Sequence, residues 1–321
     1  MSEYGNFIRR ADLIKNLIDR EKLAEEKKKP NRSIQESNRQ RQIQHQELLR
    51  HEIAAQIASA NSVGGPVPPS LYFANSEKGV WFDASDISTM FQDTAGTIPV
   101  TTVSQSVAKW IDKSGNGAHA TQATGTKCPT YQVDQYGYSY LDFDGVDDFM
   151  ITPSINFTST AQMQASVGVL THNSASAATA GIVVELGINV NTVPGSFHVT
   201  APSNTADHSF GLNGSAVLSA RVPNIVAGDD ILTGIFDISQ TTKELEIIPR
   251  LAQLTADPTT IVWTGTNAGT GNFANLPIYI GSRAGTSTFF KGHMYQIVVR
   301  GATPTATQLG QIERWINSKI D

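Results

Sequence analysis

The hydrophobic positions along this chain follow two different periods, and the change occurs near residue 70. Over residues 1–60, apolar residues recur every three or four positions in a charged background, which predicts amphipathic helices. From Leu71 onward, short runs of β-branched and aromatic residues alternate with polar ones, which predicts strands. The sequence therefore predicts two parts with different secondary structure.

The helical part is predicted to contain two helices. Three lysines followed by Pro30 suit the end of the first, and Ser33 with Glu36 forms a capping box at the start of the second. Each helix has one narrow apolar stripe and needs a partner. The stripes consist of Phe7, Ala11, Ile14 and Ile18, and of Leu49, Ile53 and Ile57. The helices either pack on the chain's own β domain or form a stem that self-associates or docks on another protein.

The segment 61–70, "NSVGGPVPPS", favours the stem. It has no charge and is rich in glycine and proline, so we expect an extended linker between residues 1–60 and a domain over 71–321. The charges divide at the same place. Residues 1–60 carry 12 basic and 9 acidic residues, which leaves 12 basic and 20 acidic ones for the remainder.

The second part predicts an antiparallel two-sheet sandwich. More than ten β-rich runs, among them "GVWFDA", "GIVVELG", "SFHVT" and "HMYQIVVRG", are separated by glycine and small polar residues. Residues 305–320 return to a helical period. Thr305 and Gln308 form a capping box there, and Leu309, Ile312 and Ile316 form a stripe that we expect to lie against the sandwich.

The run "YLDFDGVDDFM" at 140–150 contains four aspartates within seven positions. Asp142 and Asp144 alternate with apolar residues, so a strand would turn them away from the core. Asp144 and Gly145 then predict a tight turn, and Phe149 and Ile151 a return strand. This interpretation makes the aspartates part of an exposed hairpin rather than a catalytic cluster.

Several of these segments together resemble a known family. "VWFDASD", "VAKWIDKSGNGAHATQAT", "PTYQ", "YLDFDGVDDFM", "GHMYQIVVRG" and "TATQLGQIERWINSK" occur in the order found in concanavalin A-like lectin/glucanase domains of the laminin-G-like branch. The series is most similar to the copies in bacteriophage virion proteins, and it covers about residues 71–321. The resemblance implies a jelly roll in which the strand at Trp81 lies close to the late strand containing Ile297 and Val299.

The glucanases of that fold have a strand with the pattern Glu-x-Asp-x-x-Glu, whose carboxylates flank the sugar bond. The closest segment here is "KELEII", in which Glu244 and Glu246 lack a middle aspartate and a third carboxylate. We therefore expect no enzyme. A polysaccharide-degrading activity is the alternative.

Calcium is a second candidate ligand. "DKSGNG" places Asp112, Ser114 and Asn116 at alternate positions before Gly117, as in an oxygen-donor loop, but the closing glutamate is absent. The simpler interpretation is a turn in which Asp112 caps its own backbone. We expect no cofactor, with calcium as the alternative.

Carbohydrate binding needs an aromatic platform with polar groups around it. Trp263 and Tyr279 lie in strand-like runs, where core packing is the default, whereas Phe273 lies in the polar loop 264–276 and is the candidate contact residue. Cys128 rules out an intrachain disulfide because it is the one cysteine. We expect Cys128 to be a buried residue and the scattered histidines to be surface or core-edge residues.

Composition narrows the functional class. The net charge of −5 argues against nucleic acid and membrane surfaces as partners, and the polar start "MSEYGNFIRR" has no apolar secretion segment. We expect a bacteriophage structural protein, such as a fibre, collar or decoration component, assembled in the host cytoplasm. Its helices would bind a capsid, portal, collar or tail protein or sister chains in a homo-oligomer, and its lectin-like domain would attach to host glycans.

Overall fold

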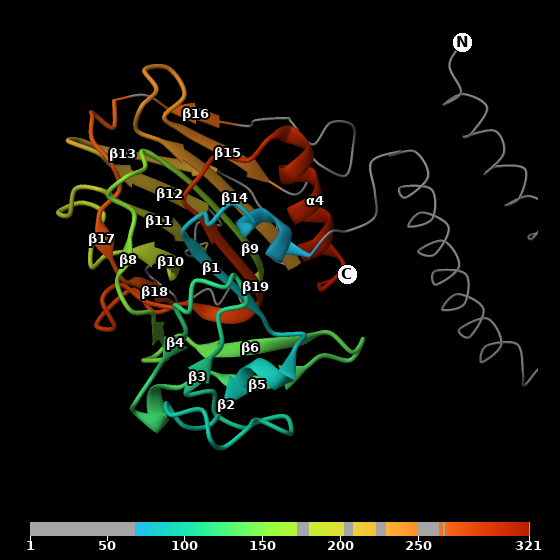
Figure 1. Ribbon diagram of the computed structural model, residues 1–321. Coiled ribbons are helices and arrows are strands. Elements are labelled where there is room, and N and C mark those ends of the chain that lie inside the picture. The colour runs from blue at the N-terminus through green and yellow to red at the C-terminus, as the bar shows by residue number, and fades with distance from the viewer. Residues whose placement is uncertain are drawn as a thin grey trace, which may run out of the picture. The chain divides into compact units, whose positions relative to one another are not determined.

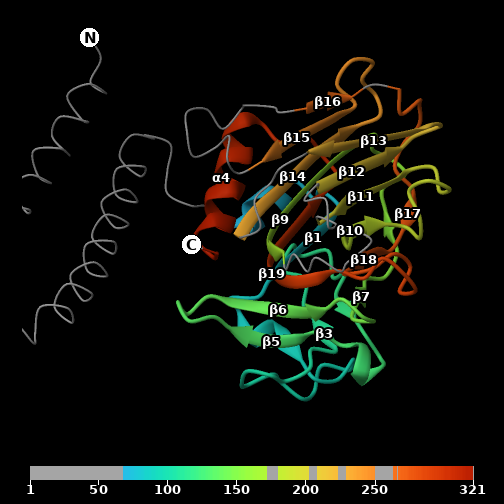
Figure 2. The same cartoon turned by 180° about the vertical axis from the view of Figure 1, so that it is seen from behind.

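The computed structural model describes residues 68–171, 180–201, 208–222, 229–249, 263–265 and 267–320. This part of the chain is mainly β, with two large antiparallel sheets and one α-helix near its C-terminal end (Figures 1 and 2). None of its helices has the length and apolar character needed to cross a membrane. The stripes expected at Phe7, Ala11, Ile14, Ile18, Leu49, Ile53 and Ile57 lie outside the described residues.

The first sheet, here called sheet A, has the strand order β16-β15-β14-β9-β19-β6-β5, and β1 also pairs with β19. Its strands are β1 (Gly79–Asp83), β5 (Thr130–Val133), β6 (Ser139–Asp144), β9 (Gln162–Thr171), β14 (Asp229–Asp237), β15 (Leu245–Pro249), β16 (Trp263–Gly265) and β19 (Lys291–Arg300).

The second sheet, sheet B, has the order β13-β12-β11-β10-β18-β7-β4-β3-β2. Its strands are β2 (Met90–Phe91), β3 (Lys109–Trp110), β4 (Ala120–Thr121), β7 (Met150–Ile151), β10 (Ile182–Leu186), β11 (Ser196–Thr200), β12 (His208–Asn213), β13 (Val217–Val222) and β18 (Ile278–Ile280). A short pair joins β8 (Ile155–Asn156) to β17 (Asn275–Leu276), and the 3-10 helices are η1 (Pro69–Phe73), η2 (Ile87–Thr89) and η3 (Gly125–Lys127).

The main core lies between the two sheets because alternate residues of each strand point inward. In β11, Phe197 and Val199 belong to this core, and in β19 Met294, Ile297 and Val299 do. Antiparallel pairing of Phe82 with Ile297 places β1 against β19, as the family resemblance implied. The outer face of each sheet is then left to meet solvent, a helix or a ligand.

The outer face of sheet A is covered by a helix. α4 (Ala306–Asn317) begins at the predicted capping box of Thr305 and Gln308, and it packs beside β9 and β14 with η1 next to it (Figures 1 and 2). Ile312 and Ile316 are fully buried in a second apolar cluster with Trp81 and Val298. The predicted helix and its stripe are therefore confirmed.

Two local predictions are wrong. β6 and β7 do not form a hairpin, because β6 pairs with β5 and β19 in sheet A, whereas β7 pairs with β4 and β18 in sheet B. The turn after Asp144 thus carries the chain from one sheet to the other. Pro69 and Ser70, expected within an extended linker, instead form the start of η1.

Candidate functional site

A row of side chains crosses the outer face of sheet B. Glu185 of β10 lies opposite Tyr279 of β18 on one side and His198 of β11 on the other, and His198 lies opposite Gly211 of β12. The residues before and after each of these four belong to the main core. Strand alternation therefore turns the whole row away from the core.

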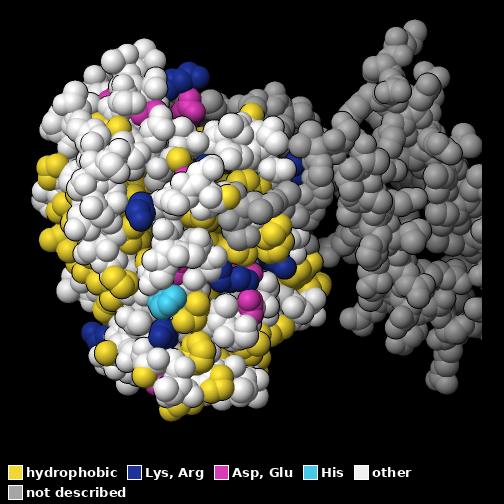
Figure 3. Space-filling view, in the orientation of Figure 1, with side chains coloured by type: hydrophobic (Ala, Val, Ile, Leu, Met, Phe, Trp, Pro, Cys, Tyr) yellow, Lys and Arg dark blue, Asp and Glu magenta, His cyan; other side chains and the backbone are white. Residues whose placement is uncertain are grey.

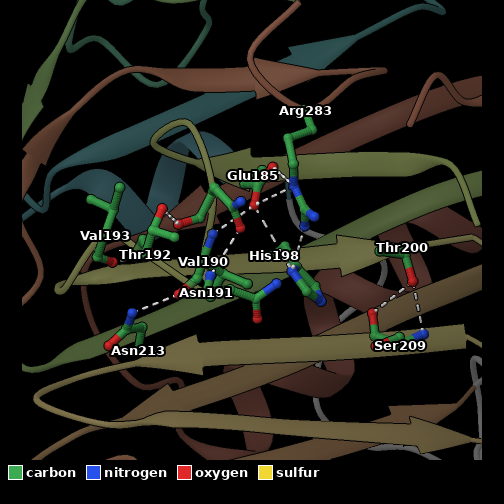
Figure 4. A network of polar contacts seen from close by, with 12 residues as sticks. Glu185, Val190, Asn191, Thr192, Val193, His198, Thr200, Ser209, Asn213 and Arg283 are labelled. Atoms are coloured by element: carbon green, nitrogen blue, oxygen red, sulfur yellow. Dashed lines mark hydrogen bonds and ion pairs between the residues drawn. The ribbon is translucent and has the colours of Figure 1, made fainter. Parts of the chain in front are cut away.

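Glu185 and Arg283 form an ion pair at the centre of this row (Figure 4). The Arg283 Nε–H donates to both carboxylate oxygens, at 3.3 and 3.1 Å, and the Val190 N–H donates to Oε1 at 2.9 Å. The Glu185 side chain is fully buried, whereas 20% of the Arg283 side chain is exposed. Burial raises the pKa of Glu185, and Arg283 and the Val190 N–H oppose that shift.

His198 is the third member of this network. Its Nδ1 lies 3.3 Å from Arg283 Nη2, and since a guanidinium can only donate, Nδ1 accepts and Nε2 carries the proton. Burial, with a smaller contribution from Arg283, lowers the pKa of His198 to about 3, so the ring is neutral at pH 7. Nε2 is buried and has no hydrogen-bond partner among the described residues.

Gly211 makes room for this imidazole. A Cβ at Gly211 would lie 2.8 Å from His198 Cε1 and 2.9 Å from Nε2, which is too close for any real side chain. Because the clash would involve a buried ring rather than a flexible chain end, a glycine at position 211 is needed for His198 to lie where it does.

The surroundings of the network carry little charge. Apart from Glu185, Lys109 and Arg221 are the charged residues that the described strands of sheet B turn outward. Figure 3 shows one face of the molecule, on which charged side chains lie scattered among apolar and uncharged ones. Ligand recognition on sheet B would thus depend on a few fixed groups.

This arrangement offers hydrogen-bond donors rather than a catalytic carboxylate pair. The partners of the Glu185 carboxylate in the described part of the chain are the Arg283 guanidinium and the Val190 backbone N–H. A glycosidase of the usual type needs two carboxyl groups flanking the bond it cleaves. Glu185 is committed to an internal ion pair, so the network suits binding.

The predicted oxygen-donor loop is occupied by internal hydrogen bonds. Asp112 accepts from the N–H groups of Trp81, Ser114 and Ala118, and from the Ser114 hydroxyl. The Asn116 amide nitrogen donates to the carbonyl oxygens of Glu77 and Gly79. These contacts tie the loop to β1, which is the geometry expected of a self-capped turn.

The aspartates of "YLDFDGVDDFM" lie in different environments. Asp144 is exposed and caps the turn through N–H groups of Val146 and Asp147, while Asp148 is buried and accepts from the Asp144 N–H. Burial raises the pKa of Asp148 to about 6, with the neighbouring aspartates adding to the shift. Ligand atoms of Asp144, Asp147 and Asp148 lie within 4.8 Å of one another, which makes them the group in the described chain that could share a cation.

Phe273 is not a surface residue. It is 1% exposed and packs edge-on against Phe197 in the main core, so the expectation of a contact residue at a loop tip is wrong. The loop bends inward there because the Phe273 N–H donates to the Thr160 carbonyl. Tyr279, assigned to core packing from the sequence, is half-buried on the outer row.

Glu244 and Glu246 do not act as a pair. Glu244 is buried and accepts hydrogen bonds from the backbone N–H groups of Asn267 and Ala268. Glu246 instead forms an ion pair with Lys243, in which Oε1 lies 3.4 Å from Nζ. Cys128 is buried, and burial raises the pKa of its thiol to about 11.

Sequence reasoning missed Glu185 and Arg283. A usable signal existed in "GIVVELG", where one carboxylate interrupts an apolar strand, because a buried charge requires a partner. The sequence could not supply that partner, which comes from a turn 98 positions away.

No protein-family model matches this chain, and no curated protein matches it. Among solved structures, the receptor binding domain of botulinum neurotoxin D is 8% identical with a TM-score of 0.48, covering 74% of this chain and 52% of that chain. Domain 4 of AbnA, a GH43 extracellular arabinanase from Geobacillus stearothermophilus, is 14% identical with a TM-score of 0.46, covering 74% and 98%. A Trypanosoma rangeli sialidase is 11% identical with a TM-score of 0.46, covering 75% and 33%.

The chain thus spans about half of the toxin domain and a third of the sialidase. At these identities and TM-scores, the similarities do not show what this chain binds or does.

Proposed function

We propose that the β-sandwich is a lectin-like, concanavalin A-type module that binds glycans on a cell surface. The observation that carries this proposal is the outward row of sheet B, where half-buried Tyr279 lies beside the Glu185–Arg283–His198 network. A sugar ring packs its apolar face on an aromatic side chain and exchanges hydrogen bonds through its hydroxyl groups.

The rest of the row leaves space for such a ligand. Beyond His198 the aligned residues are Gly211 and Ser219, which add little bulk. From β18 to β13 the row crosses four strand spacings, or about 19 Å at 4.8 Å each. That length accommodates several linked sugar rings.

The whole chain, in this proposal, is a structural protein of a bacteriophage virion, such as a fibre, collar or decoration component. Residues 1–60 anchor it to a capsid, portal, collar or tail protein, or to sister chains in a homo-oligomer, through the two predicted stripes. The proposal follows from the amphipathic periods of that segment and from the family resemblance of the β domain.

A glycan array probed with the full chain tests the binding function. We expect a defined subset of glycans to be retained, and we expect Tyr279→Ala to weaken retention by about tenfold because it removes the aromatic platform. Tyr136→Ala is the matched control, since Tyr136 is 67% exposed and lies away from this row, on the turn between β5 and β6. The absence of any bound glycan, or release of reducing sugar from a host polysaccharide, would contradict the proposal.

Deletion of residues 1–60 tests the anchoring function separately. We expect the shortened chain to be soluble and absent from purified particles. Its recovery in particles at the normal copy number would show that the anchor lies elsewhere.

A further inference from the structure

The Arg283 guanidinium is held along one edge and open along another. Its Nε–H is bonded to Glu185, and one Nη2–H to His198 Nδ1. The two N–H groups of Nη1 and the second N–H of Nη2 have no partner among the described residues. The side chain is 20% exposed, and Nη1 is not among the buried atoms of the described chain that lack a partner, so we take this end of the guanidinium to face solvent.

The open edge has the shape of a carboxylate receptor. Parallel N–H groups on Nη1 and Nη2 match the two oxygens of a carboxylate in a planar, bidentate contact. A sugar hydroxyl presents one oxygen and can engage only one of these donors well. The geometry therefore discriminates between acidic and neutral sugars.

The charge distribution favours the same ligand. Glu185 is fully buried and committed to the Nε side, so it presents no exposed oxygen that would repel an anion. The other charged residues that the described strands of sheet B turn outward, Lys109 and Arg221, are both basic. Residues 61–321 as a whole carry an excess of acidic groups, with 12 basic and 20 acidic residues, and the outward strand residues of sheet B do not share that excess.

His198 fixes the orientation of the guanidinium. A neutral imidazole accepts one Nη2–H, and Gly211 prevents the ring from being displaced by a neighbouring side chain. The buried Nε2–H, which lacks a partner among the described residues, needs an acceptor oxygen.

We propose that Arg283 binds the carboxylate group of an acidic sugar through its open Nη1–Nη2 edge, with Glu185 and His198 as positioning residues. The inference rests on the proposed glycan-binding function and names its ligand class.

The test uses the full chain with uronic-acid and sialic-acid oligosaccharides, their carboxyl-reduced counterparts, and sulfated neutral oligosaccharides. We expect binding to the carboxylated forms and a loss of at least about tenfold on carboxyl reduction, the value of one charge-assisted bidentate contact. Arg283→Lys keeps the charge but removes the fork, and it should lose affinity by a similar factor.

Arg221→Lys is the matched control, because Arg221 is exposed on the same face and outside the network. Its binding should change less than twofold. His198→Gln keeps an acceptor for Nη2 and should retain most of the binding, whereas His198→Phe should lose it. Thermal unfolding of each variant separates loss of binding from loss of folding.

Each result has one meaning. Selective binding of neutral glycans, equal effects of Arg283→Lys and Arg221→Lys, or equal effects of His198→Gln and His198→Phe would overturn this inference and leave glycan binding intact. Binding of sulfated sugars as strongly as carboxylated ones would show recognition by charge alone and would also overturn it. Failure to bind any sugar would instead refute the proposed function.

Discussion

The outer faces of the two sheets differ in which partner of an arginine–glutamate pair is buried. Both carry an arginine–glutamate pair, Arg300 with Glu77 on sheet A and Arg283 with Glu185 on sheet B. On sheet A the arginine side chain is 5% exposed, and α4 and η1 cover the neighbouring strands. On sheet B the carboxylate is the buried partner, and 20% of the arginine is exposed.

This difference separates a face that the chain covers itself from the face on which we propose binding. Sheet A continues its polar contacts under the helix, where Ser166 bonds to Gln164 and Thr233 and all three are fully buried. On sheet A, Arg300 Nε and Nη1 also lack a partner among the described residues, but they are buried, whereas 20% of the Arg283 side chain on sheet B is exposed. The chain therefore covers one face with its own helix and leaves an arginine of the other face in contact with solvent.

The largest expected effect comes from uncovering sheet A. Ile312→Ala removes a fully buried side chain from the contact between α4 and the sheet. We expect a loss of about 2–5 kcal/mol in the free energy of unfolding. Urea denaturation measures it, and Val146→Ala, at a residue that is 69% exposed, should change stability by less than about 0.5 kcal/mol. Unchanged stability of Ile312→Ala would mean that α4 does not hold sheet A.

The two ion pairs should differ when each loses its carboxylate. Glu77→Gln leaves the Arg300 charge in a buried position, and we expect it to cost about 3 kcal/mol. Glu185→Gln should cost less, about 1–2 kcal/mol, because Arg283 can turn toward solvent. The comparison is made by urea denaturation at pH 7. The opposite order would show that sheet B, not sheet A, depends more on its ion pair.

Acid should weaken sheet B through His198. Its pKa is about 3 in the folded chain and about 6.5 when unfolded, so below pH 6.5 the unfolded state binds more protons. Stability from this group is present above pH 6.5 and is lost as the pH falls toward 3, by about 3 kcal/mol at pH 4.5. His198→Gln should flatten the measured dependence between pH 7 and 4.5.

Ile312→Ala provides the reference for that titration. It removes no titrating group, so its stability loss should be the same at pH 7 and pH 4.5. A His198→Gln variant that retains the full pH dependence would place the sensitivity in other residues, such as His208, whose pKa burial lowers to about 4.

The smallest effect is expected at Asp148, in the turn that carries the chain from sheet A to sheet B. The pKa of Asp148 is about 6 in the folded chain, above its usual value, so this group favours folding when protonated and loses that contribution as the pH rises through 6. Asp148→Asn should stabilise the chain by about 1 kcal/mol at pH 8 and by less at pH 4. Thermal unfolding at the two pH values measures this, and a destabilised variant at pH 8 would show that the carboxylate is needed in its charged form.

The sequence predicted most of the strands and little of the site. Runs rich in β-branched and aromatic residues, such as "GIVVELG" and "SFHVT", became β10 and β11, because such side chains favour strands. The capping box at Thr305 likewise located α4. These features depend on neighbouring residues, and local sequence contains that information.

The errors arise where distant segments decide the structure. The turn after Asp144 is typical of a hairpin when its sequence is taken alone. In the structure, β6 pairs with β19 and β7 pairs with β18, and both partners lie more than 100 residues later. Phe273 looks exposed in a polar loop, but the core has space for its ring beside Phe197. The Glu185–Arg283 pair combines both difficulties, since neither residue shows its partner locally.

The pairing of β1 with β19 has a consequence for synthesis. Gly79 is matched with Arg300, so β1 has no partner in sheet A until β19 (Lys291–Arg300) has left the ribosome. Contacts this distant in sequence make folding slow. The nascent chain has to avoid aggregation during this time. Translation that stops before residue 291 would give a chain without β19, in which sheet A cannot be completed.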